Sequence, residues 1–247
     1  MEVLALDTSN RPLSAAVLED QHVLATLTST VHSQHSKNLL PIIERLMKES
    51  GLEPEDLTRV VVASGPGSYT GIRIACTTAK VLAFTMGIDL VSVSSLLTLA
   101  LNVTASEGAL VNPVFDARNR NLFTGLYQIK NHVPVNVIPD QHVSLSEWLN
   151  QLARFKQKII GIGDADHFKP QFCKVLGNRI SWASGLDNLP QAGQLGLYGE
   201  HQTPVRDVNA FLPNYLRLTP AQARWRKQHP NADRRPGAYV DMYQAKI

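Results

Sequence analysis

The 247-residue sequence contains only two cysteines, Cys76 and Cys173, which lie far apart in segments with periodic apolar residues. Two isolated cysteines exclude a disulfide framework and do not have zinc-site spacing, so we expect a reducing compartment. Long apolar runs are also missing. The longest, at 81–93, contains Gly87 and Asp89 and is shorter than the roughly 20 residues of a membrane span. The N-terminal residues lack a basic signal region, and we expect a cytoplasmic protein with no membrane partner.

Charge is sparse and nearly balanced, with 24 Lys and Arg against 21 Asp and Glu, while 44% of the residues are apolar. This composition excludes intrinsic disorder, and the length corresponds to one large domain or two small ones. The basic residues are unevenly distributed: residues 217–247 carry a net charge of +5 and the first 216 residues carry −2. The basic segment is either a solvated terminus or an electrostatic contact for nucleic acid, and the sequence leaves both open.

The first hundred residues predict strands and helices in a definite order. Short turns join three apolar or alternating segments at 3–8, 13–18 and 23–30, which predicts an antiparallel meander. Helical spacing predicts one helix at 38–50, capped by Ser33 or Ser36, and another at 71–86, with Thr70 as its candidate cap. Continuous apolar runs at 59–64 and 90–93 predict buried parallel strands. The order is βββαβαβ.

The second half repeats this order more faintly. It predicts strands at 112–117, 122–130, 133–138 and 158–162 and helices at 144–155 and 168–176, the first with Ser144 and Glu147 as a capping box. In each half an acid ends the first strand, Asp7 or Asp116. We infer an α/β fold with two lobes, a duplicated βββαβα unit of the actin-like ATPase (ASKHA, ribonuclease H-like) class. The expected boundaries are 1–103 and 104–216, followed by a basic segment at 217–247 that is partly helical and then disordered.

The most distinctive segment is Ser-Gly-Pro-Gly-Ser-Tyr-Thr-Gly-Ile-Arg at 64–73, a glycine-rich turn between a strand and a helix. Its glycines allow close backbone approach, and free N–H groups at a helix start bind anions. It lacks the Lys-Ser/Thr of a Walker A loop, so a phosphate cradle and a tight structural turn stay equally open. Asp7 and Asp116 are candidates for magnesium-phosphate chemistry, although residues 8–12 contain no glycine and Pro12 removes a donor.

The helix predicted at 71–86 is apolar at ten of its sixteen positions. Arg73, Thr77 and Lys80 leave only a narrow polar stripe, and the row Ala75, Ala79 and Ala83 would let another helix approach closely. Such a helix is either ordinary core or a face that binds a partner protein. An arginine at Ala79 would be tolerated in folding only if that row faces a partner.

His32 and His35 are three residues apart and could share a metal, but no third ligand is within reach in the sequence. A surface role is therefore favoured, and we expect no metal site. The chain also lacks the Gly-x-Ser-x-Gly and His-Glu-x-x-His motifs of hydrolases.

Several segments resemble the bacterial TsaB (YeaZ) family. They are Leu-Ala-Leu-Asp-Thr-Ser at 4–9, His-Ser at 35–36 with Leu-Leu-Pro at 39–41, the glycine-rich segment at 65–74, Val-Ser-Val-Ser-Ser-Leu at 91–96, Asp-Ala-Arg at 116–118 and Pro-Asn-Tyr-Leu-Arg at 213–217. The resemblance covers residues 1 to about 225 and is strongest in the first hundred.

The resemblance implies a non-catalytic subunit of the machinery that makes N6-threonylcarbamoyladenosine in tRNA, at the adenosine 3′ to the anticodon. In that family the paralogous TsaD-type subunit carries the metal and transfers the threonylcarbamoyl group, and a TsaE-type ATPase joins the pair. The first two helices form the interface with TsaD, and the same face makes a homodimer when the partner is absent. The chain alone would bind no cofactor, ATP and magnesium would be used by the complex, and tRNA would be reached indirectly through the complex.

The resemblance also assigns residues to two sites. The implied partner-binding residues are Leu39, Leu40, Ile43, Leu46, Met47, Arg73, Ile74, Thr77, Thr78, Val81 and Leu82. The implied degenerate nucleotide or phosphate cleft consists of Asp7, Thr8, Ser9, Gly65, Gly67, Asp116 and Gly163.

Two other functions compete with this interpretation. One is a stand-alone ATP-binding enzyme of the actin-like class that uses Asp7 and Asp116. The other is a metallopeptidase, for which the chain would have only His32 and His35 as ligands.

Overall fold

The computed structural model describes residues 1–31, 34–217, 225 and 228–229. Residues Met1–Leu216 form one compact unit, and Arg217–Ile247 form a second. The prediction that the basic segment is partly helical and then disordered falls mostly outside the described residues. Within the described ranges, no helix is both long and apolar enough to cross a bilayer.

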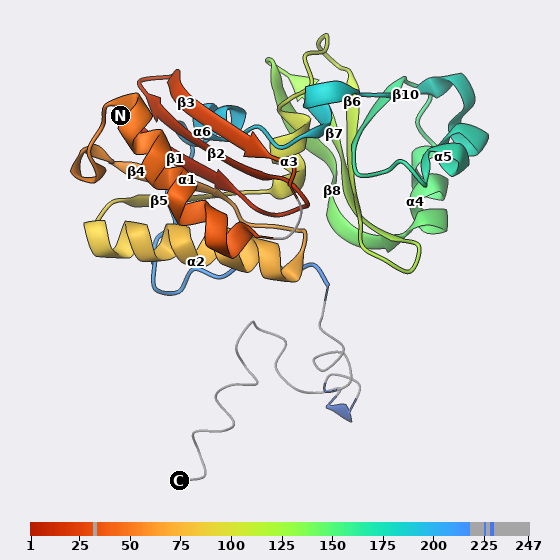
Figure 1. The fold of residues 1–247 in the computed structure, drawn as a ribbon. Helices are drawn as coiled ribbons and strands as arrows, with labels where there is room; N and C mark the ends of the chain where they lie inside the picture. Colours follow the sequence, from red (N-terminus) through yellow and green to blue (C-terminus); the bar gives the residue numbers. More distant parts are fainter. Residues whose placement is uncertain (32–33, 218–224, 226–227, 230–247) are drawn as a thin grey trace. The chain divides into compact units, whose positions relative to one another are not determined.

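The first sheet has the predicted meander followed by parallel strands (Figure 1). Strands β1 (Glu2–Asp7), β2 (Leu13–Glu19) and β3 (His22–Ser29) pair antiparallel, and β4 (Arg59–Ala63) and β5 (Asp89–Val93) extend the sheet in parallel from β1. The order across the sheet is β3-β2-β1-β4-β5. Because β1 and β4 lie inside the sheet and are apolar between their ends, both of their faces are buried.

The second sheet repeats this topology and confirms the duplication. It contains β6 (Leu110–Asp116), β7 (Asn121–Lys130), β8 (Val133–Ser144), β9 (Ile159–Gly163) and β10 (Ile180–Trp182). Its order, β8-β7-β6-β9-β10, matches that of the first sheet strand for strand. The predicted strand at 133–138 is too short, because pairing with β7 continues through a register shift to Ser144. The strand β10 was not predicted.

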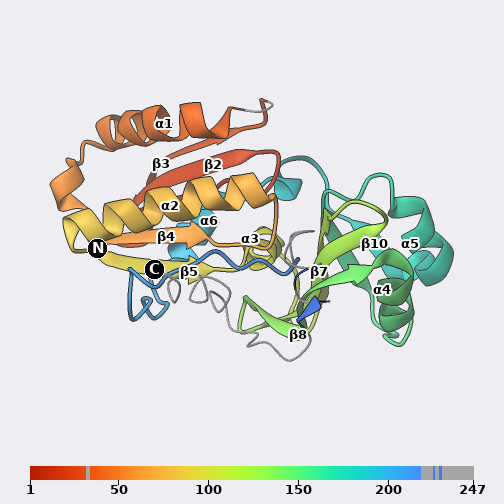
Figure 2. The same cartoon turned by 90° about the horizontal axis from the view of Figure 1, so that it is seen from below.

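Two long helices cover one face of the first sheet, side by side in both views (Figures 1 and 2). These are α1 (His35–Ser50) and α2 (Tyr69–Met86), and their apolar residues share one core with β1, β2 and β4. The opposite face is covered by α6 (Ala192–Gly199), which packs on β1, β2 and β4. The predicted boundary at 103/104 therefore does not divide the packing, because a helix from the 104–216 range completes the first lobe.

The caps of α1 and α2 differ from those predicted. Helix α1 begins at His35 after Gln34, so Ser36 lies inside the helix and is not its cap, while Ser33 lies outside the described residues. Helix α2 is capped by Ser68 and not by Thr70, because the Ser68 hydroxyl accepts the third N–H of the helix, that of Gly71, at 3.3 Å.

The second lobe has shorter helices and a more aromatic core. Helices α4 (Leu145–Leu152) and α5 (Lys169–Leu176) bury Trp148 and Phe172 against the second sheet. The Ser144 half of the predicted capping box of α4 is confirmed, since the Ser144 hydroxyl accepts the Glu147 N–H at 3.3 Å. Short 3-10 turns occupy Pro54–Asp56, Gly177–Arg179 and Gly185–Asn188.

A short helix between the two sheets, α3 (Ser95–Ala100), ties the lobes together. It packs against β6 and β7, and it was not predicted. Its cap, Ser94, donates from its hydroxyl to the Asp140 carboxylate of β8, and the Tyr127 hydroxyl donates to the same carboxylate at 2.5 Å. The first sheet is thus anchored to the second through the residue that follows β5.

The side chain of Arg59, at the start of β4, holds the C-terminal end of α6. Its guanidinium donates to the carbonyl oxygens of Gly199 at 3.0 Å, Glu200 at 2.7 Å and Gln202 at 3.2 Å. It also donates to a carboxylate oxygen of Asp89 at 2.8 Å. A buried arginine at a helix C-terminus satisfies carbonyls that have no partner within the helix.

We predict that Arg59→Leu lowers the free energy of unfolding by about 2–4 kcal/mol, because it leaves buried carbonyl groups without a donor. Urea unfolding followed by circular dichroism measures this loss. The matched control is Arg45→Leu, which removes only an exposed ion pair with Glu49 within α1 and should change stability by less than about 0.5 kcal/mol. Equal losses in the two variants would refute the role of Arg59.

Candidate functional site

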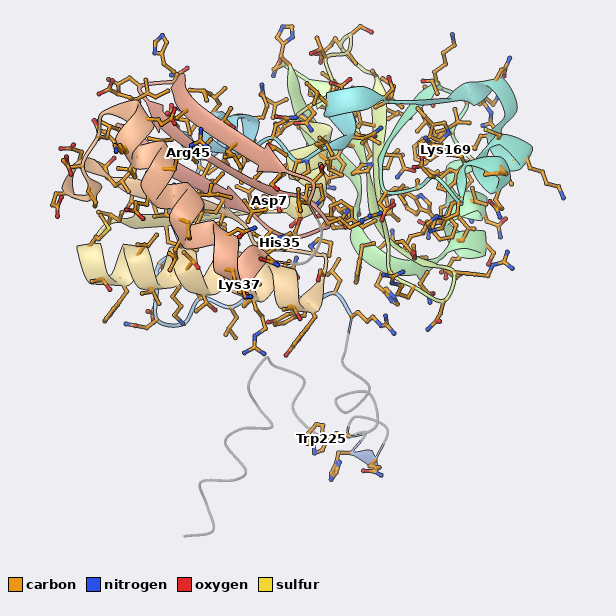
Figure 3. The ribbon with its side chains drawn as sticks, viewed as in Figure 1. Asp7, His35, Lys37, Arg45, Lys169 and Trp225 are labelled. Carbon is orange, nitrogen blue, oxygen red and sulfur yellow. The ribbon has the colours of Figure 1, made fainter. Side chains whose placement is uncertain are left out.

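Asp7, at the end of β1, is fully buried in the first lobe. One of its carboxylate oxygens accepts the Ser9 N–H at 2.7 Å, while Asp7 Oδ2 and Ser9 Oγ have no hydrogen-bond partner among the described residues. His35, at the start of α1, lies near enough for its charge to act on the Asp7 carboxylate (both are labelled in Figure 3). Burial raises the pKa of Asp7 to about 6, against the opposing effects of the hydrogen bond from the Ser9 N–H and the charge of His35. The ionised Asp7 therefore lowers the stability of the folded first lobe.

The glycine-rich turn packs directly on the two residues that follow Asp7. A Cβ at Gly67 would lie 2.2 Å from the Ser9 carbonyl oxygen, and one at Gly71 would lie 2.1 Å from that of Thr8. The Ser68 N–H donates to the Ser9 carbonyl at 2.7 Å, and the Thr8 hydroxyl donates to the Gly71 carbonyl at 2.7 Å. Of the two interpretations left open by the sequence, this packing favours the tight structural turn.

A third glycine of the turn, Gly65, has φ near +116°. The backbone near the C-terminal end of the unit Met1–Leu216 packs against it. A Cβ there would lie 2.6 Å from the carbonyl oxygen of Asn214, whose own N–H donates to the Ser64 carbonyl at 2.8 Å. Asp7, Thr8, Ser9, Gly65 and Gly67 are thus brought together, and backbone of the same chain occupies the space beside the glycines.

The remaining residues assigned to the cleft lie on the second sheet. Asp116 ends β6, where it accepts the Arg118 N–H at 2.7 Å and lies 3.2 Å from His167 Nε2. Gly163 ends the neighbouring strand β9 and donates its N–H to the Asn188 side chain at 2.9 Å. The acids Asp7 and Asp116 therefore belong to different sheets, each at the carboxyl end of a first strand.

The histidine pair gives no support to metal chemistry. His35 Nε2 lies 3.1 Å from the Asn10 carbonyl oxygen, and His32 lies outside the described residues. Among the residues that the structure describes, no three His, Cys, Asp or Glu side chains gather in an arrangement that could hold a metal ion.

Some of the residues that the resemblance assigns to partner binding are not exposed on α1 and α2. Leu39, Ile43, Leu46 and Met47 are buried in the core of the first lobe, because the apolar stripe of α1 faces its own sheet. These four side chains are core residues of the first lobe and do not lie on its surface. Ala75, Ala79 and Ala83 are likewise buried, so an arginine at Ala79 would disrupt the fold.

The outward side of α2 carries an exposed stripe at helical spacing: Arg73, Thr77, Val81 and Phe84. Val81 is 56% exposed and Phe84 is 61% exposed, and Leu40 on α1 is 59% exposed. The other assigned residues of α2, Ile74, Thr78 and Leu82, are half-buried. We call Leu40, Arg73, Thr77, Val81 and Phe84 the outer helical surface.

Sequence reasoning missed Phe84 and Tyr69 as surface residues. Tyr69 begins α2 and is half exposed, its ring stacks on that of Tyr215 with centroids 5.0 Å apart, and its hydroxyl accepts from Arg73 at 3.1 Å. The sequence could have indicated Tyr69, because it shares one helical face with Arg73, Thr77 and Val81 at intervals of four residues. The contact with Tyr215 joins residues that are far apart in the sequence and carried no signal.

We predict that Asp7→Asn stabilises the protein at pH 7. The folded pKa of about 6 lies above the ordinary 3.8, so the folded state binds the proton more tightly. The wild-type protein then loses stability as pH rises from about 4 to 6, by about 3 kcal/mol in total, and a neutral amide avoids this loss. Urea unfolding should show equal stabilities near pH 4 and a variant that is more stable at pH 7. Asp166→Asn, at an exposed site paired with Lys169, should show no such gain. Curves that stay parallel for wild type and Asp7→Asn would contradict the prediction.

We also predict that Gly71→Ala destabilises the fold although alanine normally favours a helix. The added Cβ would overlap the Thr8 carbonyl oxygen, and the shift this forces should cost about 3 kcal/mol. Gly87→Ala is the control: Gly87 has φ of +68° but no atom within 4 Å of the added Cβ, so about 1 kcal/mol is expected. Thermal and urea unfolding measure both, and a larger loss at Gly87 would refute the packing role of Gly71.

Comparisons with known proteins agree with this architecture. A family model described as "TsaD: tRNA N6-adenosine threonylcarbamoyltransferase" matches residues 24–187. The TsaB protein of Bacillus subtilis, named for tRNA threonylcarbamoyladenosine biosynthesis, is 38% identical over 226 residues, covering 91% of this chain and 98% of the relative. TsaB of Haemophilus influenzae is 27% identical over 244 residues, covering 92% and 97%. The structure of YeaZ from Pseudomonas aeruginosa has a TM-score of 0.69 at 25% identity, covering 87% of this chain and 99% of that one.

The duplicated topology, the glycine-rich turn and these relatives lead to one assignment. The chain belongs to the TsaB (YeaZ) family of tRNA threonylcarbamoyladenosine biosynthesis proteins.

Proposed function

We propose that this chain is the non-catalytic subunit that binds and activates a TsaD-type transferase, which modifies the adenosine 3′ to the anticodon of tRNA. The outer helical surface is the binding site for that subunit. In this proposal a TsaE-type ATPase joins the pair, and tRNA is reached through the assembly. We expect the chain to act in the cytoplasm, because its proposed substrate is tRNA.

The observation that carries the proposal is the exposed apolar stripe on α2. Val81 and Phe84 leave more than half of their side-chain surface in water, on a helix whose opposite side is already buried in the core. Burying a side chain of this size contributes about 1.5–3 kcal/mol, and large apolar residues together with arginine are common anchors of interfaces. Arg73 and Thr77 continue the stripe toward the start of the helix and would supply its polar contacts.

The closed surroundings of Asp7 support the non-catalytic part of the proposal. Phosphate binding at the end of β1 requires open backbone N–H groups and glycines that let a ligand approach. Here the carbonyl groups of Thr8 and Ser9 lie against Gly71 and Gly67. We therefore propose that ATP and magnesium are used by the complex and are not bound by this chain alone.

The same surface accounts for the state expected of the chain on its own. An exposed apolar stripe attracts whichever complementary face is available, and two copies can present the same stripe to each other across a twofold axis. We propose that the chain forms a homodimer through the outer helical surface and exchanges it for the transferase subunit.

We predict that Phe84→Asp together with Val81→Asp abolishes binding to the species-matched TsaD-type subunit. Both residues are exposed, so the melting temperature should change little, while the dissociation constant should rise at least about 100-fold. Light scattering of the chain alone and mixed with that subunit, with calorimetry for affinity, measures both effects.

The matched control is Val175→Asp, an exposed valine on α5 in the second lobe, which should leave binding unchanged. If the wild-type chain is monomeric and indifferent to the transferase subunit, the proposal fails. Magnesium-dependent ATP binding that Asp7→Ala abolishes would then point to the stand-alone enzyme.

A further inference from the structure

The turn between β6 and β7 has an unusual backbone. Every non-glycine residue with positive φ among those that the structure describes lies in one of three hairpin turns. Two of these turns need such residues at two positions each, as two-residue hairpins do: Asp20 and Gln21, and Asn131 and His132. The β6–β7 turn has three in succession: Arg118 at +68°, Asn119 at +52° and Arg120 at +57°.

Arginine is poorly suited to this conformation. Glycine adopts positive φ without strain, and Asn or Asp tolerate it, whereas a long side chain adopts it at a cost. Where a residue has a strained backbone conformation and its side chain does not stabilise the fold, we infer a functional role. Arg118 is 82% exposed and Arg120 is also exposed, so packing does not explain either residue.

The turn lies at the carboxyl end of β6, where the parallel strand β9 also ends. In α/β sheets, ligands bind at this edge. Asp116 is already engaged there: it accepts the Arg118 N–H and contacts His167, and the Arg118 guanidinium lies 3.8 Å from its second oxygen. Asp166, in the loop after β9, is paired with Lys169 at 2.7 Å.

No carboxylate in the described part of the chain lies within ion-pair distance of Arg120. Arg118 has only the distant contact with Asp116, and Asp164 is the other acid of the loop after β9. The edge therefore presents two arginines whose positive charge is not neutralised by close pairs.

We propose that Arg118 and Arg120 bind phosphate groups of the tRNA backbone. The guanidinium group is planar and donates two parallel hydrogen bonds to a phosphate, and it is the side chain that recognises phosphate best. The left-handed turn holds the two arginines together at a sheet edge while keeping their side chains in water. The inference goes beyond the proposed partner role, in which tRNA is reached only through the transferase, and it does not use the outer helical surface.

The test replaces both arginines by the residue that the backbone prefers, as Arg118→Gly with Arg120→Gly. Binding of a fluorescently labelled anticodon stem-loop RNA is measured by anisotropy over a salt series, with the full-length chain and with its transferase complex. The double variant should bind about tenfold more weakly, and the slope of log affinity against log salt should be shallower by about 1.5, as for two lost phosphate contacts. Its melting temperature should rise by about 2–4 °C, because the strain is relieved.

Two controls separate the arginines from the backbone and from charge in general. Asn131→Gly with His132→Gly relieves the same strain in the β7–β8 turn and should raise the melting temperature without changing RNA binding. Arg154→Gln removes an exposed arginine after α4 and should leave the salt slope unchanged.

Three outcomes would overturn the proposal. The first is unchanged RNA affinity and salt slope in the double variant, and the second is the absence of RNA binding by both the wild-type chain and its complex. The third is weaker binding to the transferase subunit with RNA binding intact, which would assign the turn to a protein partner. The double variant should still associate with the transferase subunit. A failure of RNA binding is therefore distinguishable from a failure of the outer helical surface.

Discussion

The contact between the glycine-rich turn and the end of β1 determines how the first lobe is built. The Thr8 hydroxyl donates to the Gly71 carbonyl and accepts the Ala75 N–H, so it is inserted into the first turns of α2. This fixes where α2 begins and how it is rotated. Its alanine row is consequently turned into the core, and Arg73, Thr77, Val81 and Phe84 are turned outward. The proposed interaction surface thus depends on the contact between the end of β1 and the start of α2. The two segments are more than 60 residues apart in the sequence.

The two lobes show how one topology supports two different outcomes. Both sheets have the same strand order, and both first strands end in an acid that accepts the N–H two residues later at 2.7 Å, from Ser9 in one lobe and Arg118 in the other. The connecting helices differ: α2 has 18 residues and leaves Val81 and Phe84 more than half exposed, whereas α5 has eight residues, buries Phe172 and leaves Val175 less exposed. The longer helix gives the first lobe an exposed stripe of more turns than α5 can give the second lobe.

The sequence could predict strands β1 to β9 and the helices α1, α2, α4 and α5, because their apolar periodicity is strong and their turns are marked. It could not predict the end of β8, the strand β10 or the short helix α3. It could not predict α6, whose three glycines, Gly193, Gly196 and Gly199, suggest a break in regular structure. In the fold these glycines let the helix lie directly against Val23, Leu18 and Val61. Nor could it separate a core stripe from a partner stripe on α1, because Leu39, Ile43 and Leu46 have the spacing that either role requires.

The residues that cost stability are found at the same edge of both sheets. Asp7 is buried with an unpaired oxygen, and Arg118 and Arg120 occupy strained positions after Asp116. Each lobe therefore departs from the most stable choice at the acid of its first strand or just after it. The consequences differ because the surroundings differ. In the first lobe the chain's own carbonyl groups, just after Asp7, lie directly against the glycines of the glycine-rich turn. In the second lobe Asp116 is largely buried, while Arg118, Arg120 and His167 are exposed to water beside it. A duplicated fold can therefore pack its own backbone at one edge and, in our proposal, bind phosphate at the other.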